Sequence, residues 1–397
     1  MKKFFVNTIA TGKSQYNAFT QFEKFYLNAF TQLGATICPP TNGKIVIDPS
    51  DIDQSFFLTF AYAGNDTLWH IYRHFPEVPI VNLLIDHPLD TFIPSPELGD
   101  YVPTYFPVAF DPCWVEYIER HRAQPNSAPL SAVYMPLPGF VHPEVTTFVP
   151  PSQRDIDILF AGSIVDPEVL KQTWHTESPG AARAIDTITE HCVANPGAQI
   201  DVMLETGLSP KDASNVDFMM ALFRYANDYC RAFHRLKLLR ALAMGNVPAT
   251  VYTNQPDLLS ELVGPHHFDI HPPVDFSDLL KLMSQSKIVI NSRPNTQGVS
   301  ERVPSTMLNG AVSFNDTNNA LSQEFKDGRE AIFFDYQNLE ELPGKIFHLL
   351  SHPDELNAIA SAGQQKARLH HTVSHRAQSI LDNVERFREI FNSAHQA

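Results

Sequence analysis

A strand, a polar loop, a short helix and a second strand follow one another between residues 287 and 316. Branched apolar residues predict the first strand, and Gly310 ends the helix. Two strands joined through a helix form a parallel pair, so the loop and the first helical turn lie at the carboxyl edge of a sheet. The four predicted segments are residues 288–290, 291–300, 301–309 and 311–314.

This loop and the start of its helix form a predicted anion site. The first N–H groups of a helix lack intrahelical acceptors and the helix dipole is positive there, which favours phosphate. Arg302, in the first turn, adds a planar two-pronged cation that suits a diphosphate. The competing interpretation is an arginine on the helix surface. Asn291, Ser292, Asn295 and Gly298 donate hydrogen bonds to phosphate or sugar, or they simply form turns.

The rest of the chain alternates strand-like and helix-like segments, which predicts an α/β protein with parallel sheets. Its 397 residues exceed one ordinary core and suit two domains. A proline-rich connector at residues 148–154 marks the boundary. We expect domains at residues 1–152 and 153–375, and a final helix at 376–397 that can pack back on the first domain.

Two further segments contain candidate site residues. Gly162 and Ser163 follow a predicted strand, a turn that lets a ligand approach the backbone. Asp86 and His87 follow another buried strand, where a carboxylate or an imidazole can act as general base. The alternative for Asp86 and His87 is a turn before Pro88, with the aspartate bonded to its own backbone.

Charge and composition exclude several function classes. The net charge of −15 argues against nucleic acid and anionic lipid as partners. No apolar run reaches the roughly 20 residues that span a bilayer, and the N-terminus lacks the apolar block of a signal peptide. We therefore expect a protein without a transmembrane segment, in the cytoplasm or exported without a standard signal. The four cysteines match no zinc or redox spacing.

A required metal is not expected. Two Asp-x-Asp triplets, at residues 51–53 and 155–157, have a pattern that can hold a divalent cation, but the second lies within an alternating strand. The helix dipole and Arg302 can offset the charge of a diphosphate without a metal ion.

The second half of the chain resembles the CgeB-like and group-1-like glycosyltransferases of bacteria. The order and spacing of the similar segments match as well. The first half resembles the family more loosely, through residues 78–90 and 135–139. The segments that carry the resemblance in the second half are residues 155–164, 232–242, 274–316, 325–356 and 362–381.

The resemblance implies a GT-B fold, with two Rossmann-like doubly wound domains facing across a cleft. The first domain would bind the acceptor and the second the donor, a nucleotide-diphosphate sugar. Catalytic roles fall to Asp86, His87 and Arg302. The residues assigned to the donor are Gly162, Ser163, Arg235, Asn291, Ser292, Asn295, Gly298, Ser300, Glu301 and Ser305.

One position departs from the family pattern. Many relatives hold the donor ribose with a glutamate at the place where this chain has Ser305. Glu301, next to Arg302, could replace it if the loop bends differently. A basic residue near Arg235 often faces the donor phosphates in the family; a surface salt bridge is the alternative.

These observations predict a glycosyltransferase, most simply a hexosyltransferase of glycan biosynthesis, without a required metal or other cofactor. It would move a sugar to a glycan, a lipid-linked glycan or a protein. Two alternatives remain: a sugar-nucleotide epimerase on the same fold, and a non-catalytic sugar-nucleotide or glycan-binding protein. The serine at position 305 makes the second alternative plausible.

Overall fold

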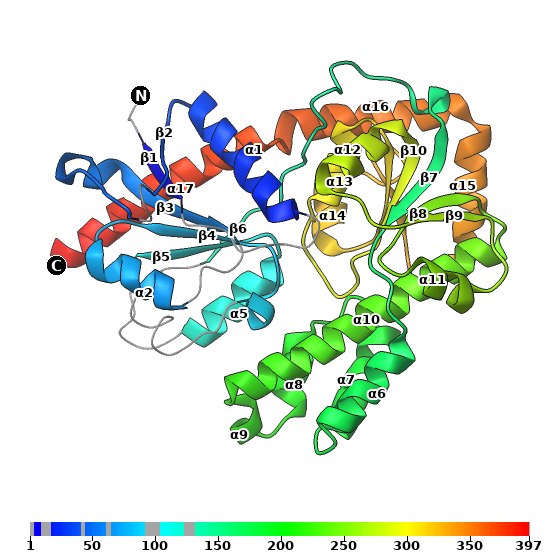
Figure 1. Cartoon of the computed structure of the whole chain (residues 1–397), viewed down its shortest axis with the longest axis horizontal. Coiled ribbons are helices and arrows are strands. Elements are labelled where there is room, and N and C mark those ends of the chain that lie inside the picture. Colours follow the sequence, from blue (N-terminus) through cyan, green and yellow to red (C-terminus); the bar gives the residue numbers. More distant parts are fainter. Residues whose placement is uncertain are drawn as a thin grey trace. The chain divides into compact units, whose positions relative to one another are not determined.

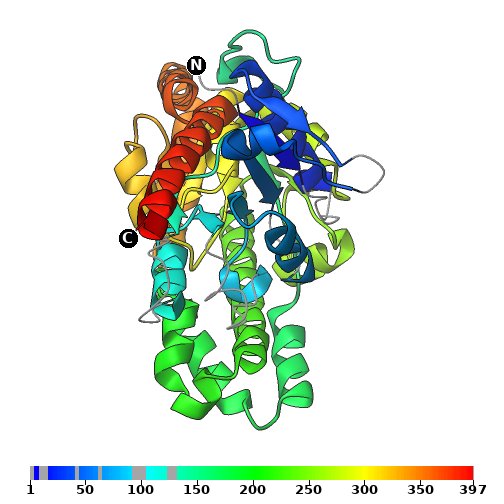
Figure 2. The same ribbon diagram turned by 90° about the vertical axis from the view of Figure 1, so that its left-hand side faces the viewer.

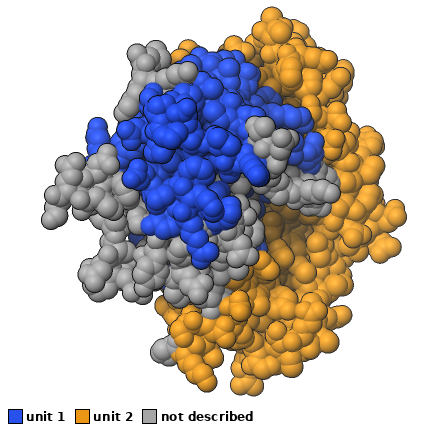
Figure 3. All heavy atoms as spheres, turned by 60° about the vertical axis from the view of Figure 1, so that its left-hand side comes forward, with its two compact units in different colours: residues 1–138, 372–397 blue, residues 139–371 orange. Residues whose placement is uncertain are grey.

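The chain forms two compact units in a computed structural model, which Figure 3 distinguishes by colour. Unit 1 contains residues 1–138 and 372–397, and unit 2 contains residues 139–371. The stretch 139–152, which the sequence assigns to the first domain, thus belongs to unit 2. The residues that the structure describes are 4–8, 17–40, 44–60, 65–91, 104–122 and 132–396.

Unit 1 is built on a six-stranded parallel sheet with the strand order β2-β1-β3-β4-β5-β6 (Figure 1). Every residue of β3, β4 and β5 is buried, because helices cover both faces of such a sheet. The strands are β1 (Phe5–Thr8), β2 (Thr36–Cys38), β3 (Ser55–Phe60), β4 (Ile80–Leu84), β5 (Tyr105–Ala109) and β6 (Val133–Tyr134).

The last helix of the chain, α17 (Val373–Gln396), is part of unit 1 and packs against α1 (Ala18–Gln32) (Figure 2). Arg376 Nε donates to the carbonyl oxygen of Pro136 at 2.6 Å. Arg388 donates to the carbonyl oxygens of Asp53 and Ser55. Arginines therefore join α17 to the backbone of unit 1. The other helices described in unit 1 are α2 (Asn65–His74), α3 (Pro88–Thr91) and α5 (Pro112–Arg122), with a 3-10 helix η2 (Pro49–Gln54).

Unit 2 has a second six-stranded parallel sheet, with the order β12-β11-β10-β7-β8-β9 (Figure 1). From β7 the chain runs outward to β8 and β9, then returns to β10 on the other side of β7. Two parallel sheets with flanking helices confirm the predicted α/β class. The strands are β7 (Ile156–Ala161), β8 (Ala249–Tyr252), β9 (Phe268–His271), β10 (Ser286–Asn291), β11 (Val312–Asp316) and β12 (Ile332–Phe334).

Helices cover both faces of this sheet. The core on one face joins strand residues to α10 (Val216–Met244), α11 (Pro256–Val263) and α15 (Leu342–Ser351). On the other face lie α12 (Phe276–Gln285) and α13 (Arg302–Leu308), which pack against each other. Helix α16 (Pro353–His370) contributes to the first core near its start and packs against α13 nearer its end. The remaining short elements are η3 (Pro151–Gln153), α14 (Asn319–Glu324) and η4 (Leu339–Glu341).

A group of helices is inserted between β7 and β8. It comprises α6 (Pro167–Glu177), α7 (Ala182–Ala194), α8 (Ile200–Gly207), α9 (Pro210–Ala213) and the first half of α10. In Figures 1 and 2 these helices extend away from the sheet of unit 2. The sequence predicts one mostly helical stretch over residues 168–195, but Pro179 and Gly180 divide it into α6 and α7.

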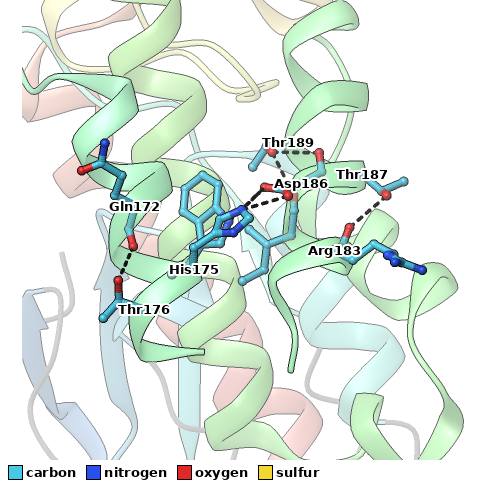
Figure 4. A network of polar contacts seen from close by, with 9 residues as sticks. Gln172, His175, Thr176, Arg183, Asp186, Thr187 and Thr189 are labelled. Atoms are coloured by element: carbon cyan, nitrogen blue, oxygen red, sulfur yellow. Dashed lines mark hydrogen bonds and ion pairs between the residues drawn. The ribbon is translucent and has the colours of Figure 1, made fainter. Parts of the chain in front are cut away.

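A carboxylate joins the first two inserted helices, as Figure 4 shows. Asp186 on α7 accepts a hydrogen bond at 3.1 Å from the indole N–H of Trp174, which is fully buried on α6. The same carboxylate lies 3.0 Å from Nε2 of His175. Asp186 thus satisfies the one polar group of a large core side chain.

In the part of the chain that the structure describes, no helix combines the length and the apolar character required to cross a bilayer.

Substituting Asp186→Ala should lower the free energy of unfolding by about 1–3 kcal/mol, because it leaves the buried indole N–H of Trp174 unsatisfied. Urea unfolding followed by tryptophan fluorescence measures the change. Thr187→Ala is the matched control, since that hydroxyl bonds only the exposed carbonyl of Arg183 on the same helix (Figure 4). The control should stay within about 0.5 kcal/mol. Equal effects of the two substitutions would contradict the assigned role of Asp186.

Candidate functional site

The candidate site lies where β7, β10, β11 and β12 end, at the carboxyl edge of the unit 2 sheet. The chain leaves β7 in one direction and β10 in the other, so the strand order reverses between them. Open α/β sheets bind ligands at such a reversal. Gly162 and Ser163 follow β7, and Ser292 and Arg293 follow β10.

Two arginines hold the backbone at the end of β7. Arg302, at the start of α13, donates to the carbonyl oxygen of Ala161. Arg235, on α10, donates through Nη1 to the carbonyl oxygen of Ser163 at 3.0 Å. The structure therefore brings together four predicted site residues, Gly162, Ser163, Arg235 and Arg302, although they come from three different elements.

Arg235 is a half-buried cation among other cations. Its pKa is lowered to about 9, first by burial and then by the nearby charges of Arg231, Arg302 and Arg293. Among the described residues, its Nε is buried without a hydrogen-bond acceptor. A buried donor of this kind costs stability until an acceptor reaches it. The charges of Arg231, Arg293 and Arg302 therefore raise the positive potential around Arg235.

A buried carboxylate lies in the same place. Asp316, at the end of β11, accepts a hydrogen bond at 3.0 Å from the backbone N–H of Arg293. Burial raises the pKa of Asp316 to about 6, although the hydrogen bond from Arg293 and the charge of Arg235 oppose the shift. Tyr336, just beyond β12, interacts with this carboxylate, and its hydroxyl is 2.6 Å from that of Ser292.

Sequence reasoning missed Asp316, Tyr336 and Arg293. The available signal was topological: each residue follows a predicted strand, and all such ends meet at one edge of a parallel sheet.

The predicted loop residues contact other protein groups. Asn295 has a left-handed backbone, with φ of 57°, and its N–H donates to Pro196 at 2.7 Å. Its side-chain amide donates to Ala198 at 3.1 Å. The inserted helices thereby hold the loop. Asn291 donates across the sheet to Asn315 at 2.9 Å.

The carbonyl oxygens of Gly298 and Ser300 accept hydrogen bonds from neighbouring residues. Gly298 accepts from the amide of Asn318 at 3.2 Å, and Ser300 accepts from the N–H of Val303 at 3.3 Å. The side chain of Glu301 is mostly buried and lies 3.8 Å from Nε of Arg302. These contacts shape the loop around Arg302.

Ser305 faces away from solvent. It is completely buried in α13, and its hydroxyl accepts a hydrogen bond at 3.0 Å from the N–H of Phe140. Ser305 thus contacts the segment that follows the unit boundary.

The remaining two predicted residues belong to unit 1. His87 is buried, and its Nδ1 accepts a hydrogen bond at 3.0 Å from the N–H of Leu89. Burial is the main reason that its pKa is lowered to about 3, with further contributions from Arg120 and His121. His87 therefore bonds the start of the helix that follows it, α3. Asp86, next to it, is half-buried.

Comparison with solved structures shows the class of fold. Sucrose-phosphate synthase from Thermosynechococcus elongatus has a TM-score of 0.54 at 9% identity, covering 98% of this chain and 100% of that one. Anabaena HepE, solved in complex with UDP and glucose, has a TM-score of 0.51 at 12% identity, covering 97% of this chain and 100% of that one. A glycosyltransferase from Rickettsia africae has a TM-score of 0.53 at 10% identity, covering 98% of this chain and 99% of that one. The chain has the GT-B fold.

The sequence match is narrower than the fold match. Residues 231–382 match the model of a family described as glycosyl transferase-like. This range includes Arg235, Arg302, Asp316 and Tyr336. Comparison with curated proteins finds no match. The chain spans 55% of the length of TarM, to which it is similar with a TM-score of 0.45.

Anion binding at this site should strengthen as pH falls from 7.5 to 5.5, because Asp316 becomes protonated near its pKa of about 6 and its negative charge disappears. UDP-glucose is a suitable probe, since its diphosphate stays ionised over this range. We expect a roughly three- to tenfold decrease in Kd, measured by calorimetry.

Asp316→Asn retains an acceptor for the N–H of Arg293 and removes the charge. It should bind the probe tightly at both pH values. If the pH dependence persists in this variant, Asp316 is not its source.

Proposed function

We propose that this protein is a glycosyltransferase that uses a nucleotide-diphosphate sugar. The observation that carries the proposal is the pair of arginines from different helices, Arg235 and Arg302, that both reach the carbonyl oxygens at the end of β7. A diphosphate is the anion that suits it, because planar guanidinium groups bind phosphate oxygens in pairs. The match of residues 231–382 to a glycosyl transferase-like family supports the same class. HepE, which has this fold, binds UDP and glucose.

The chemistry follows from the charge that develops during transfer. As the bond at the anomeric carbon breaks, negative charge grows on the departing diphosphate. Arg302 and Arg235 would stabilise that charge more strongly than the charge of the intact donor. The N–H groups after β7 and β10 would add hydrogen bonds from a fixed backbone.

A general base must accept the proton of the acceptor hydroxyl. Of the two predicted candidates in unit 1, we propose Asp86. His87 is poorly suited, because its pKa of about 3 makes it a weak base and Nδ1 already accepts from Leu89. The transferred sugar is proposed to be a hexose, and the acceptor a glycan, a lipid-linked glycan or a protein.

Arg302→Ala and Arg235→Ala should each lower kcat/KM for transfer by roughly a hundredfold or more, since each removes a cation from the leaving group. The measurement is release of the nucleoside diphosphate in the presence of an acceptor. Binding can be measured without an acceptor, because a ligand of the folded state raises the Tm. UDP-glucose and the corresponding donors with other bases would be compared.

Arg240→Ala is the matched control. Arg240 lies on the same helix as Arg235 and also donates to a carbonyl oxygen, that of Leu262, at 2.9 Å. Activity should be unchanged. A wild-type rate in Arg302→Ala would remove this arginine from the mechanism.

We propose that transfer requires no metal ion, because the arginines can supply the positive charge that a bridging cation would otherwise provide. Dialysis against EDTA should leave the rate unchanged within about twofold. An activity that EDTA abolishes and that Mg²⁺ or Mn²⁺ restores would refute this proposal.

A second candidate is a protein that binds a sugar nucleotide without turning it over. The buried, bonded position of Ser305 favours it, because that residue presents no group to a ligand in this structure. Donor binding without any product across a broad acceptor panel would support this candidate. The same product analysis, run without an acceptor, would reveal an epimerase.

A further inference from the structure

Three hydrogen bonds fasten the segment 139–142 to helix α13. The hydroxyl of Ser305 accepts from the N–H of Phe140 at 3.0 Å. The amide of Asn309 donates to the carbonyl of Phe140 at 2.9 Å and accepts from the N–H of His142 at 2.9 Å. Both polar side chains are completely buried, so the bonds are shielded from water. The backbone of this segment is thus bonded to one face of the helix.

The packing between the two is close. A Cβ placed on Gly139 would lie 2.5 Å from the carbonyl carbon of Pro304, so only glycine fits there. The N–H of Gly139 donates to the carbonyl of His371 at 2.7 Å. These are the first and last residues of unit 2. The two places where the chain passes from one unit to the other, at Gly139 and His371, are therefore hydrogen-bonded to each other. The one at Gly139 also packs directly against α13.

The same helix carries Arg302 at its other end. Arg302 and Ser305 are about one helical turn apart, and the residues from Val303 to Leu308 are all buried. A short, completely packed helix moves as one body, because close-packed interiors transmit displacement. A shift of Phe140 against Ser305 would therefore shift Arg302 against the carbonyl of Ala161.

We propose that Ser305 and Asn309 are positioning residues, which couple the chain segment at the unit boundary to the arginine at the donor site. The coupling deepens the proposed function and rests on it, because it gives domain movement a direct route to the cation that stabilises the leaving group. It also assigns a role to Ser305, which stands where the family pattern has a ribose-binding glutamate: its hydroxyl bonds the segment 139–142.

The test uses the full chain and compares Ser305→Ala with Ser286→Ala. Ser286 is an equally buried serine whose hydroxyl bonds a nearby carbonyl, that of Leu282, at 2.7 Å, at the other end of β10. Hydrogen exchange is measured at two places: the amide of Phe140, which Ser305 bonds directly, and the amide of Gly162, beside the carbonyl that Arg302 holds. Kd for UDP-glucose, and KM and kcat for transfer, are measured on the same samples.

Ser305→Ala should speed exchange at Phe140 by roughly tenfold, because one buried hydrogen bond is lost. Exchange at Gly162 should rise as well, and Kd and KM for UDP-glucose should increase severalfold. Ser286→Ala should change none of these quantities. A rise at Phe140 alone, with Gly162 and the donor constants as in the control, would overturn the proposal.

Failure of the proposed function has a different signature. If the wild-type protein binds no sugar nucleotide, but Ser305→Ala still speeds exchange at both Phe140 and Gly162, then the coupling is real and only the assigned ligand is wrong. Should Ser305→Ala not fold, Gly139→Ala displaces the same segment from the opposite side, because its Cβ would meet Pro304. The same linked changes are expected for that variant, and wild-type exchange at both amides in it would refute the proposal.

Discussion

The hydrogen bonds of two arginines to the end of β7 are the interaction on which the site depends. Arg235 and Arg302 come from helices α10 and α13, on opposite faces of the sheet, and both reach the backbone around Gly162. Burial and then repulsion by the neighbouring arginines lower the pKa of Arg235 to about 9. Like charges held this close cost stability until an anion offsets them.

Asp316 moderates this charge. Its carboxylate is buried beside the arginines, with a pKa raised to about 6, and it fixes the first residue of the loop after β10 through the N–H of Arg293. A fully ionised partner would compete with an incoming diphosphate, whereas an apolar residue would leave the loop unsupported. A carboxyl group that titrates near neutrality lies between these extremes.

Local sequence pattern predicted the α/β class, the strand–loop–helix unit and the arginine at its start. It did not predict partners distant in sequence: nothing near Ser305 indicates that it bonds Phe140, and Asn295 reads as a turn residue although it binds the inserted helices. Strand β5 was missed because Pro107 lies inside it, and proline normally marks an edge or a break. Tertiary hydrogen bonds and packing decided each of these cases.

The attachment of α17 to unit 1 has a consequence for synthesis. Unit 2 is one continuous stretch of chain, so it can fold as soon as it has left the ribosome. Unit 1 consists of residues 1–138 and helix α17, and the arginine contacts of α17 form only after this helix has been synthesised. The sheet of unit 1 therefore gains the contacts of α17 only after the whole of unit 2 has been synthesised.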